Sequence, residues 1–339
     1  MNGPITVAGI EVEPGERRDL APLVSESYTG DRTTLPMAVF NGAHDGARVF
    51  VTAAVHGDEL NGTAVCQQLL TRLEPSVLFG VVIVVPIVNV LGAQIHSRYL
   101  PDRRDLNRAF PGSWTGSIAA RTARLLFDEV VEGATAGIDL HTAANRRANV
   151  PQIRIDTSDA EALRLARVFG TPHVLDATLR MGSLREAAKT AGVPVLTYEA
   201  GEPLRLDHDA IRIGLDGVLR VLHHLGITET GPAVGPDPTI MHQSKWLRAD
   251  RGGLVDLHVG PGDTVVADQP VWTTSSPLGA ERATATSPVA GVVIGGTTLP
   301  VVSPGDAILH IGITDGDAEP WEDDPSSEED AQAAIGEED

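Results

Sequence analysis

A histidine and a glutamate three residues apart, His56 and Glu59, follow a run of β-branched and small residues, 49–55. Imidazole nitrogens and carboxylate oxygens are zinc ligands, and a pair just past a buried strand can direct both side chains toward one point. The intervening Gly57 is expected to let the backbone bend sharply where the strand ends. Alone this pattern is a weak signal, because one chance match in a chain of 339 residues is unsurprising.

Two further polar side chains stand at the ends of apolar runs. His141 follows the run 136–140, and Glu199 ends the run 193–198. A carboxylate at the end of a buried strand is costly unless it has a partner or a chemical task. Two imidazoles and one carboxylate can bind zinc and leave a fourth position for water, and a second carboxylate can accept the proton of that water.

A polar, proline-containing segment, 98–112, supplies two arginines to the same neighbourhood. It follows the apolar run 81–85, on the side where α/β sheets build their binding sites. Arg108 can make a bidentate contact to a carboxylate, and Arg98 is a second guanidinium donor. One of the two arginines can polarise a scissile carbonyl while the other holds an anionic substrate. Together these residues supply what metal-assisted hydrolysis requires.

The elements that must position these residues alternate between strands and helices from residue 36 to about residue 225. Apolar runs predict strands, and apolar residues at helical spacing predict helices. The predicted strands are 37–40, 48–55, 81–85, 136–140, 152–155 and 193–198, and the predicted helices are 60–73, 117–132, 159–168, 184–191 and 209–224. Ser117 is a predicted N-cap. This alternation predicts an α/β layer sandwich.

The chain changes character after residues 231–238, which contain three prolines and two glycines. That composition is typical of a linker. Short strands and turns follow without a helix, and a Pro-Gly-Asp turn occurs at 261–263 and again at 304–306, which predicts a small pseudo-repeated β-barrel. We therefore expect a catalytic domain over 1–230, a β-barrel domain over 236–314 and a disordered acidic tail over 315–339.

Charge and composition narrow the range of partners. The net charge is −20, and twelve negative charges lie in residues 315–339, so nucleic-acid binding is not expected. No stretch approaches the ~20 apolar residues of a membrane span, and no secretory signal precedes the first strand, which favours a cytoplasmic location. The single cysteine, Cys66, is expected to be a packed thiol. The acid-rich, lysine-poor composition is explained equally well by a salt-rich cytoplasm and by a compositional bias of the genome.

The motifs, taken in order, resemble a known family. They are HGDE at 56–59, RYLPD at 98–102, DLNRAFPG at 105–112, DLHT at 139–142 and YEAG at 198–201. Over about residues 35–225 they resemble the succinylglutamate desuccinylase/aspartoacylase family, a branch of the zinc carboxypeptidase superfamily. The resemblance implies a mixed-sheet α/β/α zinc-carboxypeptidase-like domain. The β-rich end, with its Pro-Gly-Asp turns and SPVAGVV, resembles a lipoyl-like barrel, but it has no lysine in a lipoyl or biotin attachment context.

The resemblance also implies roles for individual residues. His56, Glu59 and His141 match the ligands of one Zn²⁺ per chain, and Glu199 matches the general base. Asn107 and Arg108 match the pair that grips the free carboxylate of the substrate.

Three further residues are assigned in the same way. Arg98 matches the arginine that stabilises the oxyanion. Asp105 matches a residue that orients a ligand histidine, expected to be His56. Arg185 is a looser candidate for binding a second anionic group.

We therefore predict a zinc-dependent amidohydrolase that acts on linear amides and cleaves a small anionic N-acyl amino acid, of the N-acetyl or N-succinyl type. One alternative is a metallocarboxypeptidase that acts on short peptides. Another is a non-catalytic protein that keeps the metal pocket to bind a small anion. A third is that the β-rich end is an interaction module that drives homo-oligomerisation.

Overall fold

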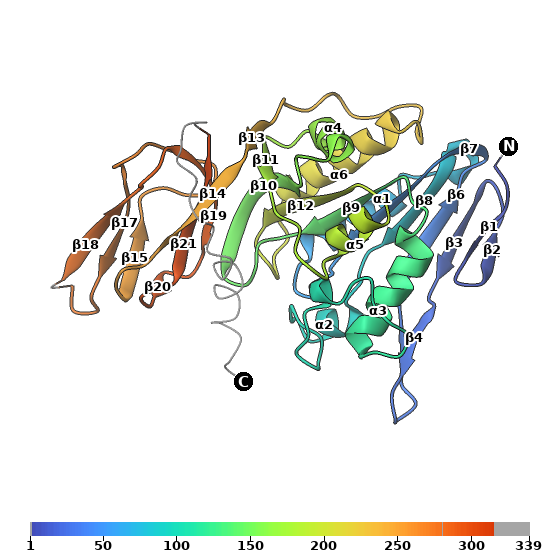
Figure 1. The fold of residues 1–339 in the computed structure, drawn as a ribbon, viewed down its shortest axis with the longest axis horizontal. Helices are drawn as coiled ribbons and strands as arrows, with labels where there is room; N and C mark the ends of the chain where they lie inside the picture. The colour runs from blue at the N-terminus through green and yellow to red at the C-terminus, as the bar shows by residue number, and fades with distance from the viewer. Residues whose placement is uncertain (1, 280, 315–339) are drawn as a thin grey trace.

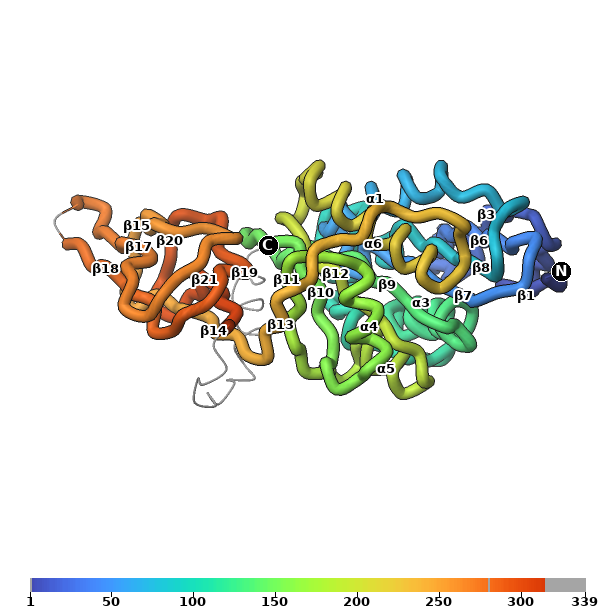
Figure 2. The backbone as a smooth tube through the Cα atoms, turned by 90° about the horizontal axis from the view of Figure 1, so that it is seen from above, coloured from blue at the N-terminus to red at the C-terminus, as the bar shows by residue number. Residues whose placement is uncertain are grey.

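The computed structural model describes residues 2–279 and 281–314. The acidic tail that we predicted to be disordered, 315–339, lies outside the described residues. Figures 1 and 2 show an elongated molecule with the α/β layers toward one end and the C-terminal strands toward the other. No helix in the described part of the chain is long and apolar enough to cross a membrane.

A mixed sheet forms the centre of the α/β part (Figure 1). Its four inner strands run parallel in the order β12, β9, β7, β8, and each outer strand runs antiparallel to the strand on its inner side. The inner strands are β7 (His44–Ala53), β8 (Phe79–Val85), β9 (Ala136–His141) and β12 (Val195–Gly201), and the outer strands are β3 (Glu16–Leu20), β6 (Met37–Asn41) and β10 (Arg147–Ile155). These match the predicted strands to within a few residues at most ends, and β3 is an addition.

Helices cover both faces of the sheet, which confirms the predicted layers. One face packs against α1 (Asn61–Leu70), α4 (Ala160–Phe169) and α6 (His208–His224). The other packs against α3 (Ile118–Leu126) and α5 (Leu184–Thr190). Each predicted helix is present because its apolar residues share one face. Ser117 caps α3 as predicted, accepting a hydrogen bond from the Ala120 amide, but the helix becomes a π-turn, η3 (Phe127–Val131), before residue 132.

Several short elements had no sequence prediction. They are β1 (Ile5–Val7), β2 (Ile10–Val12), β4 (Leu23–Glu26), β5 (Arg32–Thr34), η1 (Pro75–Val77), α2 (Val90–Gln94), η2 (Leu106–Arg108) and β11 (His173–Asp176). Each has too few residues to show a period of its own.

Residues 239–313 are here called the C-terminal β-region. Within the described part of this region there are strands and no helix. These are β13 (Thr239–Met241), β14 (Gln243–Arg248), β15 (Gly253–Leu257), β16 (Thr264–Val265), β17 (Pro270–Ser275), β18 (Arg282–Thr286), β19 (Gly291–Thr297), β20 (Val301–Val302) and β21 (Ala307–Ile313). One sheet has the order β18, β17, β15, β20. Strands β14, β21 and β19 instead continue the central sheet, because β19 pairs with β10.

The two Pro-Gly-Asp turns have the same structure. Gly262 and Gly305 both have a positive φ, of 100° and 91°. In each turn the aspartate side chain accepts a hydrogen bond from the backbone amide of the residue before the proline, at 2.8 Å for Asp263 and 2.7 Å for Asp306. Proline fixes the first turn position and glycine supplies the left-handed second one. The predicted internal repeat is therefore visible in the turns.

Helix α1 lies directly on the sheet at its first turn. A Cβ atom on Gly62 would lie 2.7 Å from the Cβ of Leu140 and 2.9 Å from the Cβ of Ala53. Only glycine therefore lets α1 approach β7 and β9 this closely, and this approach sets the distance between the segment before α1 and the end of β9.

We predict that Gly62→Ala lowers the free energy of unfolding by about 1–3 kcal/mol, because the added methyl group overpacks the contact between α1 and the sheet. Denaturation by urea measures this. The matched control is Gln67→Ala on the exposed face of α1, which is expected to change stability by no more than about 0.5 kcal/mol. An unchanged midpoint for Gly62→Ala would contradict the prediction.

Candidate metal centre

The candidate site lies at the carboxyl ends of three parallel strands. His56 and Glu59 are in the turn that follows β7, and His141 is the last residue of β9. Glu199 is in β12, paired in register with His141. Parallel strands bring their carboxyl ends to one edge of a sheet, which is why His56 and His141 meet here although they are 85 positions apart (141 − 56).

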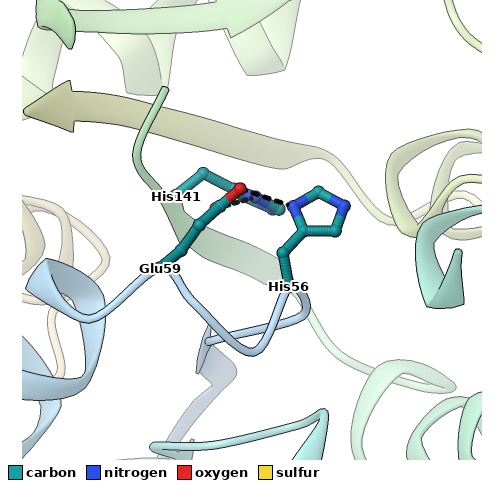
Figure 3. Close-up of side chains that lie close together, drawn as sticks. All are labelled: His56, Glu59 and His141. Atoms are coloured by element: carbon teal, nitrogen blue, oxygen red, sulfur yellow. Dashed lines mark hydrogen bonds and ion pairs between the residues drawn. The ribbon is translucent and has the colours of Figure 1, made fainter. Parts of the chain in front are cut away.

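Glu59 lies between the two histidines (Figure 3). Its Oε1 is 2.7 Å from Nδ1 of His56, and its Oε2 is 2.8 Å from Nδ1 of His141. The backbone amide of Thr142 donates a further hydrogen bond to Oε2, at 3.1 Å. All three side chains are buried, and one ligand atom from each lies within 4.8 Å of the others.

The outer nitrogen of each imidazole faces a second carboxylate. Nε2 of His141 is 2.7 Å from Asp139, and Nε2 of His56 is 3.3 Å from Asp105. An imidazole that donates its Nε2 proton to a carboxylate keeps the Nδ1 lone pair for a metal, and such partners recur behind metal-ligating histidines. The donor set and its supporting carboxylates therefore fit a divalent cation with a preference for nitrogen and oxygen ligands.

Gly57 is needed for a reason that differs from our expectation of a sharp bend. Its φ is not positive, and the left-handed residue in this turn is Ala54, at 49°. A Cβ atom on Gly57 would lie 2.1 Å from the carbonyl carbon of Gly92 and 2.2 Å from the amide nitrogen of Ala93. Glycine is required because the backbone of α2 passes directly against the HGDE turn.

Charge balance in this buried cluster shifts several pKa values. Burial opposes ionisation of Glu59, but the two neighbouring histidines outweigh it and lower its pKa. Burial likewise opposes the charged form of His141, yet the charges of Asp139 and Glu59 raise its pKa well above the ordinary value. Burial and the charge of Glu59 raise the pKa of Asp58 to about 6.

Arg98 lies against the same group of side chains. Its Nη2 donates a 3.0 Å hydrogen bond to Asp105, and its Nη1 is 3.2 Å from Nδ1 of His56 and 3.5 Å from Glu59. Its side chain is only 12% exposed, so its positive charge acts where little water screens it. The structure thus brings Arg98 and Asp105 to the His–Glu–His group.

The predicted substrate-binding residues lie beside one another, on the segments 105–108 and 182–185. Asn107 accepts a 2.9 Å hydrogen bond from the backbone amide of Leu184. A Cβ atom on Gly182 would lie 2.5 Å from the carbonyl oxygen of Arg108. Arg185 donates to the backbone carbonyls of residues 177 and 178, at 3.2 and 3.0 Å. Their contacts with a substrate remain predictions.

Two residues of the site were missed by the sequence prediction. Asp139 had a signal, because it is two positions before His141 in one strand and so shares its face. Asn149 had none. Its side-chain amide donates a 3.1 Å hydrogen bond to Oε2 of Glu199, a contact set by the pairing of β10 with β12.

Fold and site together define a mixed α/β protein with a buried His–Glu–His group that could hold a metal ion, at the carboxyl edge of its sheet. Residues 45–225 match the succinylglutamate desuccinylase/aspartoacylase catalytic domain. The chain belongs to that family, as the motifs indicated.

Relatives in sequence and structure agree with this assignment. An N-alpha-acetyl-L-2,4-diaminobutyric acid deacetylase from Halomonas elongata is 27% identical over 263 residues, 73% of this chain and 76% of that protein. A succinylglutamate desuccinylase/aspartoacylase structure from Rhodobacter sphaeroides has a TM-score of 0.80 and 26% identity, covering 89% of this chain and 96% of its own. The product-bound ectoine utilization protein EutE (DoeB) from Ruegeria pomeroyi shares the fold, with a TM-score of 0.80 and 21% identity. The match covers 88% of this chain and 95% of that one.

We predict that Asp139→Ala weakens Zn²⁺ binding by about 10- to 100-fold, because His141 loses the carboxylate that fixes its ring. Competition with a chromophoric chelator measures the affinity. Thr52→Val should have a smaller effect in the same direction, since Thr52 donates to Asp139 at 2.7 Å. Thr122→Val in α3 is the control, because that hydroxyl donates within its own helix. Equal affinities for Asp139→Ala and the parent would show that Asp139 does not support the ligand.

We also predict that Zn²⁺ uptake releases protons. The pKa of His141 is raised, so below that pKa the ring is protonated and competes with the ion, and the affinity should fall as pH falls, by up to about tenfold per pH unit for each proton released. Titration calorimetry at neutral pH in two buffers with different ionisation enthalpies measures the release. Identical heats in both buffers would contradict it.

Proposed function

We propose that this chain is a zinc-dependent hydrolase that cleaves the amide bond of a small N-acyl amino acid. The observation that carries the proposal is Glu59 held between two histidines, with the carboxylate-bearing Glu199 on the neighbouring strand in register with His141. Membership of the family and the likeness to a deacetylase that is named for an N-acetylated diamino acid support an N-acyl amino acid as the substrate.

His56, Glu59 and His141 would hold one zinc ion, since two imidazoles and a carboxylate are a common ligand set of catalytic zinc sites. When bound, zinc lowers the pKa of a water molecule toward ~7 and polarises a carbonyl group.

Glu199 would act as general base and then as general acid. Its carboxylate would accept the proton of the attacking water and later donate a proton to the leaving amine. Asn149 holds one of its oxygens, so the carboxylate has a defined direction.

The arginines would stabilise negative charges of the substrate. Arg98 is buried beside the ligand group, where a guanidinium stabilises negative charge that develops on the acyl oxygen. Asn107 and Arg108 would hold the free carboxylate of the amino acid and so fix its register. Arg185 is a candidate for a second anionic group.

The proposal predicts that Glu199→Gln lowers kcat by about 10²- to 10⁴-fold while the zinc content stays unchanged, because the amide cannot accept a proton. The assay is hydrolysis of a panel of N-acetyl and N-succinyl amino acids, including diamino acids, by the zinc-loaded protein. Glu229→Gln, at an exposed position after α6, is the control and should remain active.

Two results would overturn the proposal. Near-normal turnover by zinc-loaded Glu199→Gln would exclude Glu199 as the base, and activity that survives full removal of the metal by a chelator would exclude the zinc mechanism. Dipeptides in the same panel distinguish the carboxypeptidase alternative, because a peptidase should cleave them faster than N-acyl amino acids. Absence of turnover across the zinc-loaded panel would favour the non-catalytic alternative.

A further inference from the structure

Asn149 occupies a junction between the central sheet and the C-terminal β-region. It lies in β10, where its backbone is in register with Gly201 of β12 on one side and with Gly295 of β19 on the other. Its side chain is buried, with 8% exposed, and its Nδ2 donates a 3.1 Å hydrogen bond to Oε2 of Glu199. One amide group therefore has Glu199 on one side and the C-terminal β-region on the other.

Gly295 leaves the space that this amide occupies. A Cβ atom on Gly295 would lie 2.4 Å from Oδ1 of Asn149, closer than non-bonded atoms approach. The φ of Gly295 is not positive, so glycine is required here for space rather than for conformation. At the next position, the nearest atom to a Cβ on Gly296 would be the flexible end of the Leu309 side chain, at 3.1 Å. The nearest backbone atom, the carbonyl oxygen of Ile308, would lie at an ordinary contact distance of 3.4 Å.

The same strand is held at a second position two residues earlier. The guanidinium of Arg147 lies 5.1 Å from the ring centre of Trp246 in β14, and that ring stacks on His310 in β21 at 4.4 Å. The Arg147 side chain is buried, and a cation over an indole ring is an attractive contact that restricts both partners. Nearby, Thr298 donates hydrogen bonds to Glu202 and to the carbonyl of Arg146. The C-terminal β-region therefore contacts the start of β10 at several positions, next to the strand that carries the Glu199 carboxylate.

We propose that Asn149 is a positioning residue for Glu199 and that the C-terminal β-region, through Gly295, holds Asn149 in place. The inference rests on the proposed role of Glu199 as general base. An amide donor that binds one carboxylate oxygen restricts rotation of the group, so the other oxygen keeps its direction toward the reacting water. On this view the C-terminal β-region contributes to catalysis without touching the substrate.

The test is a double-mutant cycle on the zinc-loaded full chain. Asn149→Ala should lower kcat about tenfold or more, the loss expected for a hydrogen bond to a charged group, with KM and zinc content unchanged. Gly295→Ala should lower kcat in the same way by displacing the amide. The double variant should be no slower than Asn149→Ala alone, because the added methyl group then has nothing to displace.

Two further variants separate positioning from packing. Gly296→Ala is the matched control in the same strand, and it should keep the parent kcat. Asn149→Asp keeps the shape of the side chain but removes the donor, so it should be as slow as Asn149→Ala. If Gly295→Ala does not fold, Asn149→Ala and Asn149→Asp still decide the matter.

Several outcomes would overturn the inference. One is a parent-like kcat for both Asn149→Ala and Asn149→Asp. Another is losses from Asn149→Ala and Gly295→Ala that multiply in the double variant, and a third is a change confined to KM or zinc content. Glu199→Gln distinguishes this failure from failure of the proposed function. If Glu199→Gln is inactive while the Asn149 variants are normal, only the positioning role is lost. If Glu199→Gln is active, the proposed function fails as well.

Discussion

The contact on which the site depends is the buried carboxylate of Glu59 between two imidazoles. A carboxylate is costly to bury. The cost of burying Glu59 is offset by contacts with His56, His141 and a backbone amide, each within about 3 Å. Those partners come from two strands, so the turn after β7 must lie close to the end of β9. Gly57 and Gly62 permit this, because any side chain there would push α2 or α1 away.

Around that carboxylate, acidic and basic groups alternate. Each histidine lies between two carboxylates, and Asp105 in turn lies between a histidine and an arginine. In order, the row is Asp139, His141, Glu59, His56, Asp105 and Arg98. Within this row each charged group has an opposite neighbour, and the contacts also fix the orientation of both rings. The same contacts that make the cluster tolerable inside the protein aim two ring nitrogens and a carboxylate at one another.

Strand β10 connects this centre to the rest of the chain. It pairs with β12, which carries Glu199, and with β19 of the C-terminal β-region. The central sheet thus continues from the metal-ligand group into residues beyond 239 without a break in hydrogen bonding. The C-terminal β-region is therefore hydrogen-bonded to the sheet that carries the candidate site, and this pairing brings Gly295 within reach of Asn149.

The sequence by itself determined the order of most strands and helices, because hydrophobic period is a local property. It also determined the candidate ligands, because His56, Glu59 and His141 stand where apolar runs end. The tertiary structure decided what surrounds them. The place of Asn149 beside Glu199 depends on strand register, and the need for glycine at position 57 depends on α2, which is distant in sequence. Neither leaves a local pattern, since both arise from the close approach of backbones that only the folded sheet brings together.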